Sequence, residues 1–118
     1  MSESRVPEVR LEIDRGVALI SLDAPARYNA ITVPMARELS AALEEVDRSP
    51  SVACLVLRGE GKAFCSGGDI ATLSAVGQDP ASPGAYEDLG AMYDSFVRLG
   101  RVSVPTIAAV QGAVVAPG

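Results

Sequence analysis

The amino-acid sequence predicts an α/β fold, and three observations lead to this prediction. Short apolar runs of strand length alternate along the chain with longer segments whose apolar residues recur at helical spacing. The order of these segments is strand, strand, helix, strand, helix, strand, which is typical of α/β proteins. Loops rich in glycine or proline join them at strand-to-helix turns, where proteins of this class bind ligands.

The first two strands are predicted to form a β-hairpin. Residues 9–14 alternate between apolar and charged side chains, which is the pattern of a half-buried strand. Residues 17–22 form a more apolar strand, and Arg15-Gly16 is suited to the turn between the two. The residues before Val9 are mostly polar, so we expect residues 1–8 to be a disordered tail.

The first helix is predicted to begin after Thr32, which is a suitable N-cap, and to tolerate Pro34 in its first turn. Glu44 and Arg48 are spaced for an i,i+4 ion pair on the polar face, which also carries Glu38. Ser49-Pro50 ends the helix. The opposite face is apolar, and the side chains expected to point into the core are Ala36, Leu39, Leu43 and Val46.

Two further strands and two further helices are predicted after this point. Residues 52–57 are a continuous apolar run, typical of a parallel strand that is covered on both faces, with Cys54 in the core. A short helix is predicted over residues 69–73, and residues 106–110 are predicted to be another buried strand. The second long helix is predicted to direct inward the side chains of Leu89, Tyr93, Phe96 and Leu99.

The composition excludes several classes of function. The 118 residues include no histidine, which rules out Ser-His-Asp and Cys-His catalysis and any His-ligated zinc or haem site in this chain. Fifteen acidic residues against ten basic ones give a net charge of −5, and there is no tryptophan, so nucleic-acid binding is not expected. The two cysteines lack C-x-x-C spacing, and we expect no metal site.

The ends and the hydropathy of the chain suggest a location. Residues 1–10 lack the apolar stretch of a signal peptide, and no apolar run is long enough to span a membrane. We therefore expect a cytoplasmic protein without membrane partners.

A glycine-rich loop at residues 59–68 is the most informative candidate site. Its backbone N–H groups can point at a ligand oxygen, although paired glycines can also serve simply to make a tight turn. A phosphate-binding loop is excluded, because Ala63 follows Gly61-Lys62 where Ser or Thr is required. Cys65 is better interpreted as a packing residue than as a nucleophile, and Asp69 as a helix cap rather than a catalytic acid.

Four segments carry a resemblance to a known family, in the order in which that family has them: residues 17–31, residues 52–59, residues 63–70 and residues 105–112. The most specific of the four is Ala-Phe-Cys-Ser-Gly-Gly-Asp-Ile, at residues 63–70. With these segments the chain resembles the crotonase (enoyl-CoA hydratase/isomerase) superfamily. The resemblance implies a crotonase-like (ClpP/crotonase) spiral of ββα units, of which residues 9–118 would be the N-terminal portion of a truncated acyl-CoA-binding domain.

The resemblance also implies a reaction class and site residues. Family members polarise the thioester carbonyl of an acyl-CoA with two backbone N–H groups, and the position of Gly68 corresponds to the first donor. The positions Ala30, Ser66, Asp69 and Ile70 correspond to the coenzyme A pocket. Coenzyme A belongs to the substrate, so no separate cofactor is implied, and the full-length assembly would be a homo-trimer or a dimer of trimers.

Arg27 has two possible roles. The resemblance places it near the phosphates of coenzyme A, where family members often have a basic residue. A solvated loop charge is the simpler interpretation, and the sequence does not decide between them.

The chain departs from the family pattern at its C-terminal end. Pro117 occupies the position of the second oxyanion donor, and proline has no N–H to donate. The catalytic carboxylates of family hydratases would fall after Gly118. The sequence therefore predicts an enzyme of the hydratase/isomerase type whose 118-residue chain is inactive alone. The alternatives are a non-catalytic acyl-CoA-binding or partner subunit, and a standalone binding module with a chance match.

Overall fold

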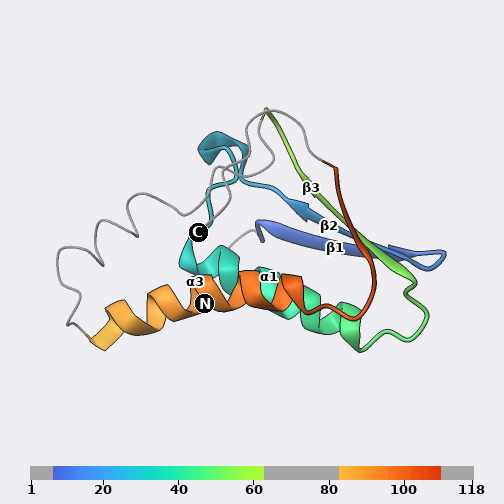
Figure 1. The fold of residues 1–118 in the computed structure, drawn as a ribbon. Coiled ribbons are helices and arrows are strands. Elements are labelled where there is room, and N and C mark those ends of the chain that lie inside the picture. The colour runs from blue at the N-terminus through green and yellow to red at the C-terminus, as the bar shows by residue number, and fades with distance from the viewer. Residues whose placement is uncertain (1–6, 63–82, 110–118) are drawn as a thin grey trace, which may run out of the picture.

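The computed structural model describes residues 7–62 and 83–109, which form a four-stranded sheet and the helices packed beneath it (Figure 1). The sheet order is β1-β2-β3-β4, with β1 and β2 antiparallel and the other neighbours parallel. This arrangement confirms the predicted α/β class and the predicted order of the elements. The helix predicted over residues 69–73 lies outside the described residues. The elements are β1 (Val9–Asp14), β2 (Val17–Leu22), the 3-10 helix η1 (Pro25–Arg27), α1 (Val33–Asp47), β3 (Cys54–Gly59), α3 (Pro83–Gly100) and β4 (Thr106–Ala109).

The β1-β2 hairpin is confirmed, and its turn also contacts the chain that leads into β3. Arg15 and Gly16 both have positive φ, at 53° and 83°, which is the conformation of a tight two-residue hairpin turn. The carbonyl of Gly16 accepts a hydrogen bond of 2.7 Å from the N–H of Ala53. The turn therefore aligns β2 with β3 as well as with β1.

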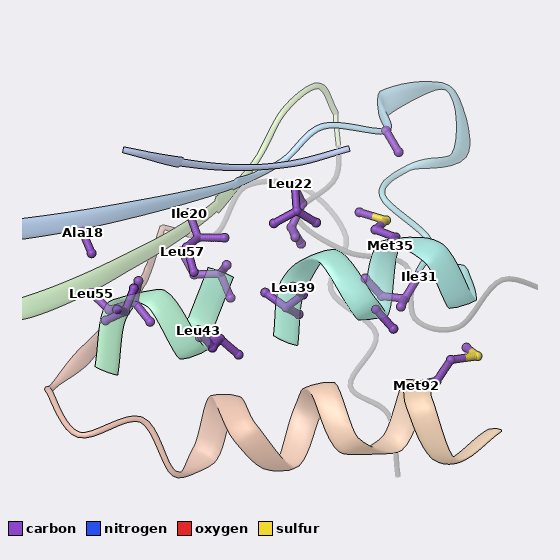
Figure 2. Packing of buried hydrophobic residues seen from close by; sticks show 14 of the residues in the cluster. Ala18, Ile20, Leu22, Ile31, Met35, Leu39, Leu43, Leu55, Leu57 and Met92 are labelled. Carbon is purple, nitrogen blue, oxygen red and sulfur yellow. The ribbon is translucent and has the colours of Figure 1, made fainter. Parts of the chain in front are cut away.

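Helix α1 forms as its sequence predicts, and it supplies one side of the core (Figure 2). The Oγ1 atom of Thr32 accepts a hydrogen bond of 3.3 Å from the N–H of Met35, which is the predicted N-cap. Glu44 and Arg48 form the predicted ion pair at 3.1 Å on the exposed face. All four side chains predicted to point inward are buried, and Met35 joins them; the buried residues are Met35, Ala36, Leu39, Leu43 and Val46.

The sheet covers α1 with one face, and the other face is only partly covered. Leu55 and Leu57 of β3 are buried toward α1, whereas Val56 is half-buried and Arg58 is exposed on the other side. The prediction that β3 is covered on both faces is therefore wrong for the described part of the chain. The strand also begins two residues later than predicted, and Cys54 at its start is half-buried rather than a core residue.

Helix α3 packs against α1, but with a different face from the one predicted (Figure 2). Met92 is buried and points toward α1, and Ser95 is buried beside it. Tyr93 is 71% exposed, so its predicted inward orientation is wrong: it lies about 100° around the helix from Met92. Phe96 and Leu99 are partly buried against the core, as predicted, and the side chain of Leu89 lies outside what the structure describes.

The last described strand is also more exposed than predicted. All four residues of β4 are exposed, and Ile107 keeps 58% of its surface accessible. The residues of the described core come from β1, β2, β3, α1, α3 and the loops between them. The prediction of a buried strand is therefore wrong for residues 106–109, although the strand itself and its parallel pairing with β3 are confirmed.

The segment that connects α3 to β4 is held by the last residue of α1. The carboxylate of Asp47 accepts hydrogen bonds from the N–H of Ser103 at 3.0 Å and from its hydroxyl at 2.8 Å. The backbone hydrogen bond and, after it, the hydroxyl hold the pKa of Asp47 below its ordinary value of 3.8.

We predict that this contact makes the stability of the fold depend on pH in the acid range. Because the pKa of Asp47 is lower in the folded chain, its contribution is present above about pH 3.8 and is lost as the pH falls through the folded value. The effect is small, since the group is exposed. Denaturation midpoints measured between pH 6 and pH 2.5 should fall less steeply for Asp47→Asn than for the wild-type chain. Glu45→Gln removes the same charge nearby and should retain the wild-type slope; equal slopes for all three chains would contradict the assignment.

Candidate functional site

The site is built around the turn that follows β2. This turn contains η1, and then Tyr28 and Asn29 adopt left-handed backbone conformations with φ of 54° and 58°. The N–H of Tyr28 bonds to the carbonyl of Pro25 at 3.0 Å, and the N–H of Asn29 bonds to that of Ala24 at 2.9 Å. Left-handed conformations are uncommon for residues other than glycine, and asparagine adopts them more readily than most. The turn is therefore a compact, internally hydrogen-bonded unit.

The side chain of Asn29 links this turn to the end of β3. The residue is fully buried, and its Oδ1 atom accepts a hydrogen bond of 2.7 Å from the N–H of Ala24. Its Nδ2 atom donates a hydrogen bond of 2.9 Å to the carbonyl of Glu60. A buried amide is costly unless it is hydrogen-bonded, so the two contacts hold Asn29 in one orientation. Asn29 was not among the candidate residues of the sequence, although it lies inside one of the matching segments.

The start of the glycine-rich loop rests on the same turn. The N–H of Glu60 bonds to the carbonyl of Leu22 at 2.8 Å, which holds the chain just after β3 beside the end of β2. Gly61 follows with φ of 88°, and a Cβ atom at this position would lie 2.7 Å from Cβ of Pro25. Only glycine fits both the conformation and the close approach. The structure thus brings the entrance of the predicted oxyanion loop against the turn that carries Arg27.

Most of the predicted site residues lie outside the described residues. This holds for the coenzyme A positions Ser66, Asp69 and Ile70, for the first oxyanion donor, Gly68, and for Pro117 at the second donor position. Their roles remain predictions. Ala30 and Arg27 are described, and both belong to the turn after β2.

Arg27 is not a solvated loop charge, because it forms a bidentate ion pair with Glu8. Its two terminal guanidinium nitrogens donate to the two carboxylate oxygens of Glu8 at 3.0 and 2.9 Å. The Arg27 side chain is 34% exposed and that of Glu8 is 24% exposed. Arg27 also donates to the carbonyl of Ala30 at 3.4 Å, and the side chain of Ala30 is itself buried. The predicted contact of Arg27 with coenzyme A phosphates is not tested by this pairing.

The backbone of Glu8 is held in place by α1. The Oε1 atom of Glu38 accepts hydrogen bonds from the N–H of Glu8 at 2.8 Å and from that of Val9 at 3.0 Å. The carbonyl of Glu8 accepts another from the N–H of Asp23 at 2.7 Å. Glu38, predicted to lie on the solvated helix face, therefore has a structural role. Glu8 is anchored to the fold, so the prediction of a disordered tail over residues 1–8 is wrong at this residue.

A second charged cluster connects Glu60, which follows β3, to side chains of β1, β2 and β3. The Oε2 atom of Glu60 lies 3.1 Å from NH2 of Arg10 and 3.1 Å from NH2 of Arg58. Arg58 also donates from Nε to the hydroxyl of Ser21 at 3.0 Å. The Glu60 side chain is thus held by two arginines, while Asn29 binds the carbonyl of the same residue, so the position of residue 60 is further restricted.

Other features of the described residues offer no competing catalytic centre. Two hollows, of about 320 and 280 Å³, are lined by residues of α1, α3 and the residue that follows α3, none of which is a predicted site residue. Within residues 7–62 and 83–109, no three His, Cys, Asp or Glu side chains are grouped as metal ligands. No helix in those ranges is long and apolar enough to cross a membrane.

Comparison with known proteins identifies the family. The sequence profile of the enoyl-CoA hydratase/isomerase family matches residues 12–118, and the chain belongs to this family. It is 43% identical over 110 residues to a Mycobacterium tuberculosis protein named probable enoyl-CoA hydratase EchA14. This match covers 93% of the present chain and 41% of the relative. The chain is 32% identical to the 1,2-epoxyphenylacetyl-CoA isomerase of Escherichia coli, covering 90% and 40% of the two chains.

Solved structures support the same assignment. The fold matches an enoyl-CoA hydratase/carnitine racemase from Magnetospirillum magneticum with a TM-score of 0.80 and 28% identity, over 92% of this chain and 40% of that one. The crotonase-like fold predicted from the sequence is thereby confirmed. The chain spans about two fifths of the length of these relatives.

We predict that the Asn29 side chain contributes substantially to stability. Asn29→Gly keeps the left-handed backbone accessible but leaves the N–H of Ala24 and the carbonyl of Glu60 without this partner. We expect a loss of roughly 2–4 kcal/mol in the free energy of unfolding, since each orphaned buried group costs about 1–3 kcal/mol. Asn29→Ala should lose roughly 1 kcal/mol more, because alanine disfavours positive φ. Urea denaturation measures both; a wild-type midpoint for Asn29→Gly would show that the two hydrogen bonds are unimportant.

Proposed function

We propose that this chain binds an acyl-CoA thioester and forms part of an enoyl-CoA hydratase/isomerase-type site that stabilises the thioester enolate through backbone N–H groups. The observation that carries the proposal is the hydrogen-bonded link from Asn29 to Glu60, which joins the turn after β2 to the entrance of the glycine-rich loop. The turn after β2 and the entrance of the glycine-rich loop, which are far apart in the sequence, therefore lie side by side. The names of the relatives given above, a probable enoyl-CoA hydratase and a 1,2-epoxyphenylacetyl-CoA isomerase, both refer to CoA thioesters.

In the proposed mechanism, the N–H of Gly68 donates to the thioester carbonyl oxygen. As the α-carbon becomes enolate-like, negative charge develops on this oxygen, and a preorganised donor stabilises it more than it stabilises the ground state. Removal of one such donor typically costs about 3–4 kcal/mol. Ala30, Ser66, Asp69 and Ile70 are proposed to contact coenzyme A, which arrives with the substrate, so the chemistry needs no further cofactor.

A non-catalytic role is the second candidate, and Pro117 is the observation that favours it. A proline at the second donor position has no N–H for the oxyanion. An acyl-CoA-binding or partner subunit needs only the first half of the apparatus. Under both candidates we expect the 118-residue chain alone to bind acyl-CoA without hydrating crotonyl-CoA, and measurable hydration would overturn the non-catalytic candidate.

Titration with a chromophoric, conjugated acyl-CoA tests the shared part of the proposal. We predict that binding to the wild-type chain shifts the thioester absorption to longer wavelength, because hydrogen bonding to the carbonyl polarises the conjugated system. Gly68→Pro deletes the donor and should abolish the shift. Gly84→Ala is the control, since a Cβ atom there meets nothing within 4 Å. An unshifted spectrum with the wild-type chain at saturation, or an equal shift with Gly68→Pro, would contradict the role of Gly68.

A further inference from the structure

The guanidinium group of Arg27 already holds an anion, and that anion belongs to the chain itself. Its two terminal nitrogens contact the two carboxylate oxygens of Glu8 at 3.0 and 2.9 Å. This fork-to-fork arrangement is the one by which arginine binds phosphate groups as well as carboxylates. A phosphate that approached Arg27 would therefore have to displace the Glu8 carboxylate from the two terminal nitrogens.

We propose that Glu8 sets the affinity of this turn for a phosphate-bearing ligand, by occupying the anion-binding edge of Arg27. The inference rests on the proposed function, in that the phosphates in question are those of coenzyme A. Glu8 competes with either the 3′-phosphate or the diphosphate, because both present the same oxygen geometry to a guanidinium group. An ionised Glu8 opposes both by charge repulsion as well as by occupancy.

The backbone around Glu8 makes this competition effective. Three backbone hydrogen bonds hold the residue: two reach Oε1 of Glu38, from the N–H groups of Glu8 and Val9, and the third joins the Glu8 carbonyl to the N–H of Asp23. The carboxylate is therefore presented to Arg27 at little cost in entropy. None of the three bonds involves the Glu8 side chain. Exchange of the Glu8 side chain therefore leaves the three bonds at the start of β1 available.

The proposal predicts that removal of the Glu8 charge strengthens phosphate binding. Glu8→Gln keeps the length of the side chain and removes the competing charge, so we expect it to bind coenzyme A roughly three- to tenfold more tightly than the wild-type chain at low salt. Glu12→Gln is the matched control: it removes the same charge from an exposed position of β1, four residues further along the chain, and should change the affinity less than twofold. Isothermal titration calorimetry measures all three dissociation constants.

A double-variant comparison shows whether Glu8 acts through Arg27. In an Arg27→Gln background, Glu8→Gln should give no gain in affinity for coenzyme A, because the guanidinium group for which Glu8 and the phosphate compete is absent. With 3′-dephospho-coenzyme A, loss of the gain identifies the 3′-phosphate as the competing ligand group, and its persistence identifies the diphosphate. Either result supports the proposal. A gain that persists in the Arg27→Gln background, or a Glu8→Gln affinity no higher than that of Glu12→Gln, overturns it.

Titration with inorganic pyrophosphate separates this proposal from the proposed function. If Glu8→Gln binds pyrophosphate more tightly than the wild-type chain but neither binds coenzyme A, Glu8 competes at Arg27 and the proposed function fails. If all variants bind coenzyme A equally, the proposed function stands and the role of Glu8 fails. If no variant binds either probe, both fail. Should Glu8→Gln not fold, Glu8→Asp, which keeps the charge but shortens its reach, must show an intermediate gain.

Discussion

The buried amide of Asn29 is the interaction on which the site depends. It joins two segments that are 31 residues apart in sequence, by a hydrogen bond of 2.9 Å to the carbonyl of Glu60. The same amide accepts the N–H of Ala24 at 2.7 Å, so the turn and the end of β3 are held by one side chain. The left-handed backbone at Asn29 aims the amide inward, and the absent Cβ of Gly61 lets the two segments meet. The turn that carries Arg27 and the described start of the glycine-rich loop, at Glu60 and Gly61, are adjacent for this reason.

Much of the fold could be predicted from the sequence, because local patterns determine it. The alternation of β1 and the N-cap of α1 each led to the correct element, and the spacing of Leu39 and Leu43 led to the correct buried face, whereas Ile13 of β1 is 40% exposed. The errors concern which faces of the strands and helices are covered by other elements, because the local sequence pattern does not show what packs against each face. An apolar run predicted β3 to be covered on both faces, yet the described helices cover one face, and Ile107 of β4 is exposed. In α3, Tyr93 and Met92 are both apolar enough to face the core, and only packing against α1 decides between them.

The site was predictable to a smaller extent. The matching segments located the turn and the loop, but the contacts that join them are made by residues that composition makes inconspicuous. Glu38 reads as one more solvated charge on a helix, and its structural role appears only when the start of β1 lies above it. Likewise, Glu8 precedes the first predicted strand and carries no motif, although it binds the arginine that the family pattern singles out. Ion pairs between distant residues have no periodicity by which a sequence could reveal them.

The central claim is that the turn after β2 and the entrance of the glycine-rich loop form one ligand-binding site. A nuclear magnetic resonance titration of the isotope-labelled chain with coenzyme A tests it most directly, because each backbone amide reports separately. The account predicts that the amide signals of Arg27, Ala30, Glu60 and Gly61 shift together and saturate at the same ligand concentration. Shifts confined to the groove between α1 and α3, or different saturation for the two segments, would contradict it.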